Sequence, residues 1–414
     1  MTGVNVFRRL LFSLAIIFCA IQTFAQVKKL NTTTFVVLGD GLTAGMGDFA
    51  LHEGYQQKSF PAQVARQIGT AFPLPLLEAP GLGNVSGFPA LPVRAPSLNQ
   101  TTVRSQFPPS LFVFNLSVPG LRIEEALSRK PIPPLVQPAD TKQTLINFVL
   151  GYPALILGTK IPKWSQVEYA RAMMPTMILI AIGYDSVAEA ATTNNPALLP
   201  DVAQYRSNLA GILDNLKRTY ASVVIATIPD PFDSAYFVSL SDATAYVGAP
   251  PSTLAGLYQL RSDDLIKLPA LMTIGRQIIA DKTSALPAGS VVSAQSAQAI
   301  RDRVVALNSA IGSLATERGV TLFNLHTVIR SVRDNGRIVG AENLTGKFMG
   351  GFYSLNGLYP GATGNGVIAN ELLQVLNQTF QKNYPLVNLE TLVANDPAMR
   401  FRPARKKPTE AEEQ

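Results

Sequence analysis

Cysteine and histidine are scarce in this chain, which contains one cysteine and two histidines among 414 residues. The cysteine, Cys19, lies in an N-terminal segment that we expect to be removed. The remaining chain could then form no disulfide and must rely on its hydrophobic core. The two histidines, His52 and His326, stand far apart in the sequence and make a poor ligand set for zinc. We expect no metal site and no cofactor.

Charged residues are also few, at 15% of the chain, whereas hydrophobic residues make up 47%. Such a composition allows a large buried core and argues against a mainly disordered chain. The formal net charge of +7 falls to +5 if Arg8 and Arg9 leave with the N-terminal segment. The remaining excess is scattered, whereas nucleic-acid binding requires a concentrated basic stripe, so we expect no nucleic-acid partner.

Residues 1–25 have the pattern of a secretory signal peptide, because Arg8 and Arg9 precede an apolar run and small residues occupy the cleavage positions. A retained membrane anchor is an open alternative, although the run is short for a span of about 20 residues. A lipid anchor on Cys19 is another, although a bulky phenylalanine precedes the cysteine. We expect cleavage, no transmembrane span afterwards, and an exported protein that is periplasmic, associated with the outer envelope, or secreted.

Short β-branched segments alternate with helical segments in the rest of the chain. The predicted strands are 34–38, 111–116, 176–182, 221–228 and 320–325, and the predicted helices are 57–69, 122–129, 201–219, 296–317 and 364–380. In 296–317 the apolar residues recur at spacings of three and four, which indicates one buried helix face. This alternation predicts a parallel sheet covered on both faces, with ligands bound outside the carboxyl ends of the strands.

Three stretches interrupt the alternation, at 71–110, 130–164 and 230–290. Long insertions beside the strand ends of such a sheet often shape a pocket or a lid, and plain surface elaboration is the alternative. We expect a single domain over 26–400 that carries these insertions. The charged segment 401–414 is expected to be a solvated, disordered tail.

Four separated stretches carry the most specific signal: FVVLGDGLTAG (35–45), FNLSVPGLRIEEAL (114–127), LIAIGYDSVAEAA (179–191) and FYSLNGLYPGATGNGVIANELLQVLN (352–377). In their order and layout they resemble the four sequence blocks of the GDSL, or SGNH, ester hydrolases. The resemblance runs from about residue 33 to about residue 380. It implies a three-layer α/β/α sandwich with a flavodoxin-like parallel sheet. It also places the family's functional positions at Gly41, Gly120, Asp185, Asn356 and Tyr359.

The side chains that the family's chemistry requires are missing at these positions. The nucleophilic serine is replaced by Gly41, the acid by Asn356, the base by Tyr359 and the oxyanion-binding asparagine by Asp185, so that Gly120 alone is retained. Glycine offers no oxygen nucleophile, and a tyrosine with a reference pKa of about 10 is a poor base at neutral pH. An ionised Asp185 would repel an oxyanion. We therefore expect the site to be inactive in ester hydrolysis.

An inactive groove would still offer polar contacts and an aromatic face. We expect the missing serine side chain to leave space beside the Gly120 N–H, and Tyr359 to offer a ring on which a sugar can stack. A neutral glycan or a lipid-linked ligand suits this mixture better than an anion, because Asp185 carries a negative charge when ionised.

Two alternatives to this interpretation stay open. One is a working ester hydrolase, of the lipase or carbohydrate esterase type, that uses a displaced nucleophile such as Thr43 or Ser354. Neither histidine is suitably placed to serve it, and Asp40 is expected to bond backbone groups of the tight turn. The other alternative is an envelope protein with a structural or partner-binding role. The sequence does not indicate the oligomeric state.

Overall fold

The computed structural model describes residues 29–83, 85, 110, 112–156, 160–396, 398 and 399. The predicted signal peptide with Cys19, the charged tail 401–414 and most of the second half of stretch 71–110 lie outside these residues. Within the described ranges, no helix is both long enough and apolar enough to cross a membrane.

A parallel sheet forms the centre of the molecule. Its strands follow the order β1 (Phe35–Gly39), β2 (Met177–Ala181), β3 (Ser222–Ala226) and β7 (Thr321–Phe323). Neighbouring strands are parallel throughout, and β1 and β2 are buried at every residue. Burial on both faces explains why these strands are continuous apolar runs in the sequence.

The predicted strand at 111–116 does not form a regular strand. This segment runs parallel to β1 on its free edge, with one bridge between Val37 and Asn115. Three backbone hydrogen bonds tie it to β1, the last from the N–H of Val118 to the carbonyl of Gly39. Pro119 and Gly120 follow immediately, so the pairing cannot extend further. Counting this edge segment, the sheet has the flavodoxin-like strand order 2-1-3-4-5.

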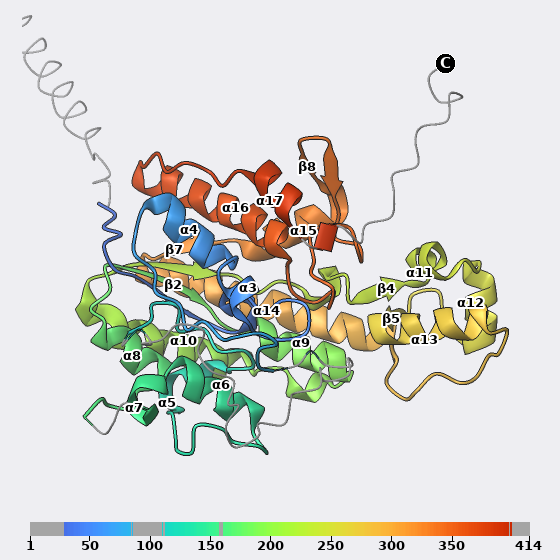
Figure 1. Cartoon of the computed structure of the whole chain (residues 1–414), viewed down its shortest axis with the longest axis horizontal. Coiled ribbons are helices and arrows are strands. Elements are labelled where there is room, and N and C mark those ends of the chain that lie inside the picture. Colours follow the sequence, from blue (N-terminus) through green and yellow to red (C-terminus); the bar gives the residue numbers. More distant parts are fainter. Residues whose placement is uncertain are drawn as a thin grey trace, which may run out of the picture.

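Helices cover both faces of the sheet (Figure 1). One layer contains α4 (Phe60–Ile68), α15 (Leu325–Asn335), α16 (Ala362–Phe380) and α17 (Leu389–Asn395), with α4 and α15 packed on α16. The opposite layer contains α5 (Ile123–Ser128), α8 (Gln166–Ala172), α10 (Val202–Leu216) and α14 (Ala294–Arg318). All five predicted helices are present, with ends displaced by a few residues. The prediction of an α/β fold with a parallel sheet between helices is confirmed.

The stretches 130–164 and 230–290 have structure of their own. The first contributes α6 (Thr141–Val149) and α7 (Tyr152–Ile156). The second holds the antiparallel strands β4 (Phe237–Ser239) and β5 (Leu265–Lys267), and β5 also pairs with β6 (Val291–Val292). Its helices are α11 (Leu240–Val247), α12 (Pro251–Tyr258) and α13 (Leu268–Ile279). Figure 1 shows this inserted sheet and its helices projecting to one side of the central sheet. A hairpin of β8 (Arg337–Val339) and β9 (Glu342–Leu344) is a further addition.

Short helices begin directly at the ends of the central strands. The helix α2 (Gly41–Ala44) follows β1, and α9 (Tyr184–Thr193) follows β2. The remaining short elements are α3 (Glu53–Gln56) and the 3₁₀ turns η1 (Pro196–Leu198), η2 (Lys217–Thr219) and η3 (Pro231–Asp233). The first turns of α2 and α9 therefore lie together at the carboxyl edge of the sheet, where their free backbone N–H groups can bind acceptors.

Candidate functional site

Four of the five positions singled out in the sequence meet at this edge of the sheet. Gly41 is the first residue of α2, and Asp185 lies in the first turn of α9. Gly120 follows the edge segment beside β1, and Tyr359 stands three residues before α16. All of them are joined through the carboxylate of Asp185.

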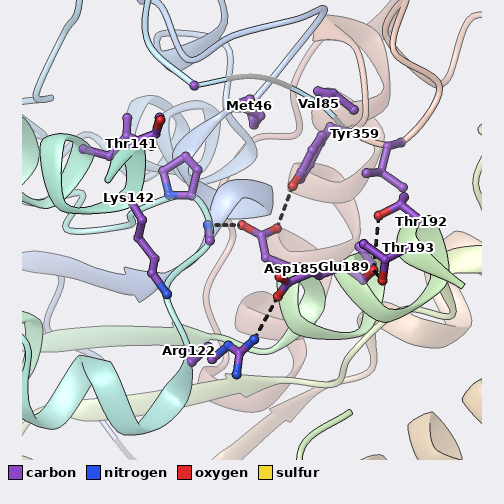
Figure 2. A pocket seen from close by; sticks show the side chains of 16 residues that line it. Met46, Val85, Arg122, Thr141, Lys142, Asp185, Glu189, Thr192, Thr193 and Tyr359 are labelled. Carbon is purple, nitrogen blue, oxygen red and sulfur yellow. Dashed lines mark hydrogen bonds and ion pairs between the residues drawn. The ribbon is translucent and has the colours of Figure 1, made fainter. Parts of the chain in front are cut away.

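Asp185 accepts three hydrogen bonds from groups that are far away in the sequence. Its Oδ2 accepts from the backbone N–H of Gly41 at 2.8 Å and of Gly120 at 2.6 Å. Its Oδ1 accepts from the hydroxyl of Tyr359 at 2.8 Å (Figure 2). Two backbone N–H groups that converge on one oxygen are what an oxyanion hole provides. In this protein the oxygen that fills the hole belongs to the chain itself.

The expected space beside the Gly120 N–H is absent, because Asp185 occupies it. A Cβ atom added at Gly41 would lie 2.8 Å from Oδ2 of Asp185 and 3.0 Å from Cε1 of Tyr359. These distances are shorter than ordinary van der Waals contact. The expectation of a vacant position left by the missing serine side chain was therefore wrong. The sequence could not show it, because the carboxylate that fills the position is 144 residues away along the chain.

Asn356 is not hydrogen-bonded to Asp185 in the described part of the chain, and its side chain bonds the backbone of its own loop. Its side chain is fully buried, and its Oδ1 accepts from the backbone N–H groups of Leu358 and Tyr359 at 2.7 and 2.9 Å. Its Nδ2 is buried without a hydrogen-bond partner in the described part of the chain. Asn356 thus shapes the loop that presents Tyr359, whose hydroxyl in turn donates to Asp185.

A second buried carboxylate supports the first. Asp40 is fully buried, and its Oδ1 accepts from the N–H of Leu42, while its Oδ2 accepts from the N–H groups of Gly183 and Asp185. Burial raises the pKa of Asp40 well above its ordinary value, and the nearby charge of Asp185 raises it further. The expectation that Asp40 bonds backbone groups of the turn is confirmed. It links the first turns of α2 and α9.

Burial shifts the pKa values of both Asp185 and Tyr359. Burial raises the pKa of Asp185, while its hydrogen bonds from Gly120, Tyr359 and Gly41 act in the opposite direction. The pKa of Tyr359 is raised well above its ordinary value, first by burial and then by the charge of Asp185. The ring of Tyr359 also packs edge-on against Tyr184, with centroids 5.8 Å apart. The residue at the base position is therefore a neutral hydrogen-bond donor.

A pocket of about 460 Å³ opens beside Asp185 and Tyr359. Its apolar wall comes from Met46, Val85, Leu145 and Leu358, and its polar rim includes Thr141 and Thr193. Figure 2 shows Arg122 and Lys142 in the same pocket. Both are paired with carboxylates, since Arg122 lies 3.0 Å from Glu189 and Lys142 lies 2.7 Å from Glu125. The pocket thus combines apolar surface with balanced charges. In the sequence, the one indication of this pocket is that some of its residues lie close to the four blocks.

The hydroxyls considered as displaced nucleophiles are both buried. Thr43 is fully buried, and its Oγ1 donates to Oγ of Ser117 at 2.8 Å. Ser354 is 2% exposed, and its Oγ accepts from the backbone N–H of Asp48 at 3.1 Å. Asp48 also accepts from the backbone N–H of Leu355, so it fastens this loop to the segment after α2. Both hydroxyls hold neighbouring segments together.

The two histidines serve local structure. Nδ1 of His52 accepts from the N–H of Gly54 and so caps α3, and burial lowers the pKa of this imidazole. His326 lies at the start of α15, with Nδ1 3.3 Å from the carbonyl oxygen of Ile228. Neither ring is bonded to Thr43 or Ser354 in the described part of the chain. No group of three or more potential metal ligands occurs among the described residues either.

One positioning residue gave no signal in the sequence. Gln166, at the start of α8, is fully buried, and its Nε2 donates to the carbonyls of Gly39 and Leu116 at 2.9 and 2.8 Å. These carbonyls end β1 and the edge segment, so Gln166 fixes the spacing between Gly41 and Gly120. The side-chain amide of Gln166 thus sets the separation of the two backbone N–H groups that bind Asp185. An isolated glutamine in a helical stretch carries no pattern that would reveal such a role.

Comparisons with known proteins give likeness in structure alone. No family profile and no curated protein sequence matches the chain. Among solved structures, a putative lipolytic protein of the G-D-S-L family from Desulfitobacterium hafniense is similar, at 10% identity, with 83% of this chain and 99% of that chain covered and a TM-score of 0.36. A phospholipase A1 from Streptomyces albidoflavus is similar at 12% identity, with 84% and 100% covered and a TM-score of 0.36.

An acetyl xylan esterase from Geobacillus stearothermophilus is also similar, at 10% identity, with 87% of this chain and 99% of that chain covered and a TM-score of 0.35. The similar structures thus include GDSL lipolytic proteins and esterases. At such identities and TM-scores, the likeness carries no argument about chemistry. The function must be argued from the residues of the site.

Proposed function

We propose that this chain is an exported, catalytically silent binding protein on an SGNH-like scaffold. The observation that carries the proposal is the carboxylate of Asp185, which accepts from Gly41, Gly120 and Tyr359 at 2.6 to 2.8 Å. An ester carbonyl that entered this site would have to displace a buried carboxylate from all three donors. It would then meet no nucleophile at position 41.

Each step of ester hydrolysis lacks the chemical group that it requires. Gly41 has no oxygen to attack a carbonyl, and the burial-raised pKa of Tyr359 prevents its hydroxyl from taking a proton as phenolate at neutral pH. Removal of one oxyanion donor alone costs about 3 kcal/mol of transition-state stabilisation. Because triad residues act as a unit, loss of the nucleophile already removes most of the rate.

The pocket beside Asp185 supports a binding role. Its cations are each paired with a carboxylate, so it offers no excess charge, and its apolar wall adjoins threonine hydroxyls on the rim. An uncharged, amphipathic ligand fits this arrangement, and we propose a neutral glycan or a lipid-linked glycan. Tyr359 is 7% exposed, so little of its side chain is available for stacking. Lateral hydrogen bonds and the apolar wall would therefore supply the affinity.

The first prediction is that the purified protein turns over no short acyl ester above background. Serine-directed phosphonate probes should leave it unlabelled, because Thr43 and Ser354 are buried and bonded. A competent GDSL esterase under the same conditions is the positive control. Stoichiometric labelling of a serine or threonine, with parallel loss of a measured turnover, would instead establish the displaced-nucleophile hydrolase.

Ligand binding is tested by a glycan array followed by calorimetry. Thr193→Trp places a large side chain on the exposed rim of the pocket and should weaken binding at least about tenfold. Thr316→Trp makes the same change on the exposed face of α14 and is the matched control. If no glycan binds, or if the two variants bind alike, the pocket is vestigial and the role lies on the insertions.

A further inference from the structure

A second cleft lies where the inserted sheet meets the central α/β unit. It has a volume of about 170 Å³ and is lined by residues of η3, β4, α11, α14, α15 and the loop after β9. Figure 1 shows β4 and α11 extending from the central unit on the side where α15 and β8 lie. We call it the arginine cleft, after Arg301 and Arg333 in its lining. It shares no lining residue with the pocket beside Asp185.

Three arginines surround two buried aspartates, and Arg301, Arg333 and Asp233 of this cluster line the cleft. Arg333 pairs with Asp233 at 2.5 Å, and Arg330 approaches the same carboxylate at 3.4 Å. Asp230 lies 3.3 Å from Nε of Arg301 and 3.5 Å from Arg330. The two aspartate side chains are at most 2% exposed, whereas the three arginine side chains are 29 to 45% exposed. The buried charges are thus compensated, and the guanidinium groups reach toward solvent.

The donors in this cluster outnumber the acceptors. Three guanidinium groups carry about 15 N–H donors, while two carboxylates offer about eight lone-pair sites. One of these sites is already used, because Oδ1 of Asp230 accepts from the backbone N–H of Phe232. In the described part of the chain, the pair with Asp230 is the one ion pair that Arg301 makes, and it uses Nε. The terminal nitrogens of Arg301 therefore remain available to an acceptor in the cleft.

An unpartnered hydroxyl lines the same cleft. Ser234 is 4% exposed, and its Oγ has no hydrogen-bond partner among the described residues. A buried hydroxyl without a partner is costly, and a ligand oxygen or a water would relieve that cost. Lys347, whose side chain is 62% exposed, lines the cleft as well and pairs with Asp242. Hydroxyl, ammonium and guanidinium donors thus converge on one small space.

Aromatic rings form the apolar side of the cleft. The guanidinium of Arg301 lies over the ring of Phe232, 5.0 Å from its centroid, and this ring packs edge-on against Phe237 at 4.7 Å. Across the cleft, Tyr246 packs on Phe348 and donates to its carbonyl oxygen at 2.9 Å. The contacts with Phe232 and Asp230 hold Arg301 in place, so its free donors are preorganised. Preorganised donors lose little entropy when they bind a ligand.

We propose that the arginine cleft is a second ligand site that binds a small molecule, or the end of a larger one, through an oxyanion group. The shared chemistry is that of a carboxylate or a phosphate, whose oxygens accept from guanidinium groups in the planar geometry that arginine favours. The volume of about 170 Å³ is below that of a typical drug-sized site, so the bound part must be compact.

Calorimetric titration of the full protein with inorganic phosphate and, separately, with benzoate tests the proposal. We expect at least one of them to bind saturably below about 10 mM. Arg301→Gln should weaken that binding at least about tenfold, and Ser234→Ala and Lys347→Gln should each weaken it several-fold. Lys217→Gln removes the same charge as Lys347→Gln from the exposed end of α10 and should bind like the parent protein.

The outcomes separate the sources of the oxyanion. Binding of phosphate alone assigns a phosphate ligand, and binding of benzoate alone assigns a carboxylate. Ser234→Ala and Lys347→Gln leave the ion pairs around Asp230 and Asp233 intact. If thermal unfolding shows that Arg301→Gln does not fold, these two variants show whether the anion binds in the cleft. The proposal is overturned if neither anion binds at about 10 mM, or if binding is equal in the parent protein and in the cleft variants.

Discussion

Gly41 and Asp185 act as a pair, because the absence of a side chain at one makes room for the carboxylate of the other. The backbone nitrogen of Gly41 lies 2.8 Å from Oδ2 of Asp185. A Cβ atom added at position 41 would also lie 2.8 Å from this oxygen. A serine at this position would therefore crowd a buried, hydrogen-bonded carboxylate. The carboxylate of Asp185 thus fills the space that a side chain at position 41 would need.

Gly41→Ser should therefore lower the free energy of unfolding by about 1–3 kcal/mol and create no esterase activity. The physical reason is the contact of the new Cβ with Asp185 and with the ring of Tyr359. Gly312→Ala is the matched control, because a Cβ at this position in α14 meets nothing within 4 Å and should leave stability unchanged or higher. Chemical denaturation measures both variants. Measurable ester turnover in Gly41→Ser, or unfolding like that of the parent, would contradict the crowded geometry.

The paired carboxyls Asp40 and Asp185 predict a dependence of stability on pH. Burial raises the pKa of both in the folded protein, so the folded state holds protons that the unfolded chain releases above about pH 4. Asp40 and Asp185 therefore increase the free energy of unfolding at low pH, and this stabilisation is lost as the pH rises through their raised pKa values. Asp185→Asn removes one of these groups and also the charge that raises the pKa of Asp40.

Asp185→Asn should consequently lose less stability than the parent protein between about pH 4 and pH 8. The amide oxygen can still accept from the N–H groups of Gly41 and Gly120, whereas the NH₂ group would donate to the hydroxyl of Tyr359 and so reverse that hydrogen bond. Asp214→Asn, at an exposed aspartate on α10, is the control for a general effect of charge. Denaturation curves across this pH range give the comparison. Parallel pH profiles for the parent and Asp185→Asn would refute the raised pKa of Asp185.

At the scale of elements, two kinds of segment were predictable from the sequence: strands that are continuous apolar runs and helices that bury one apolar face. The run at 34–38 and the apolar spacing in 296–317 led to β1 and α14, because both patterns reflect burial that each segment makes on its own. The inserted strands β4, β5 and β6 were not predicted. They are two or three residues long and become strands only by pairing with each other.

The candidate site was predictable in its location and not in its bonding. The resemblance to the ester hydrolases implied that Gly41 and Asp185 lie together, and in the structure both follow parallel strands that end at the same sheet edge. Which polar atoms would meet there depends on the crossing of α2, α9 and the loop before α16, and no local pattern encodes it. The segment 111–116 was predicted to be a strand from its local pattern. How far it pairs depends on its neighbours in space, and its pairing with β1 is limited to three backbone hydrogen bonds.

At the scale of the whole molecule, the core begins almost immediately after the predicted cleavage site. Leu30 is 4% exposed and belongs to the hydrophobic core, so the residues that follow the predicted signal peptide are already part of the fold. The described chain contains no cysteine, and its stability therefore comes from core packing and from buried polar networks such as that of Asp185.

Expression of residues 1–414 in a host with a general secretory pathway should yield exported protein whose N-terminus is Gln26. The reason is the sequence pattern of Arg8, Arg9 and the apolar run that follows, combined with a fold that starts near Leu30. N-terminal sequencing and intact mass measure the product, and Arg8→Glu with Arg9→Glu should reduce export, since the positive n-region is lost. An uncleaved chain in the membrane fraction would establish a retained anchor, and a lipid-modified Cys19 at a new N-terminus would establish a lipoprotein; either result would place the binding pocket at a membrane surface.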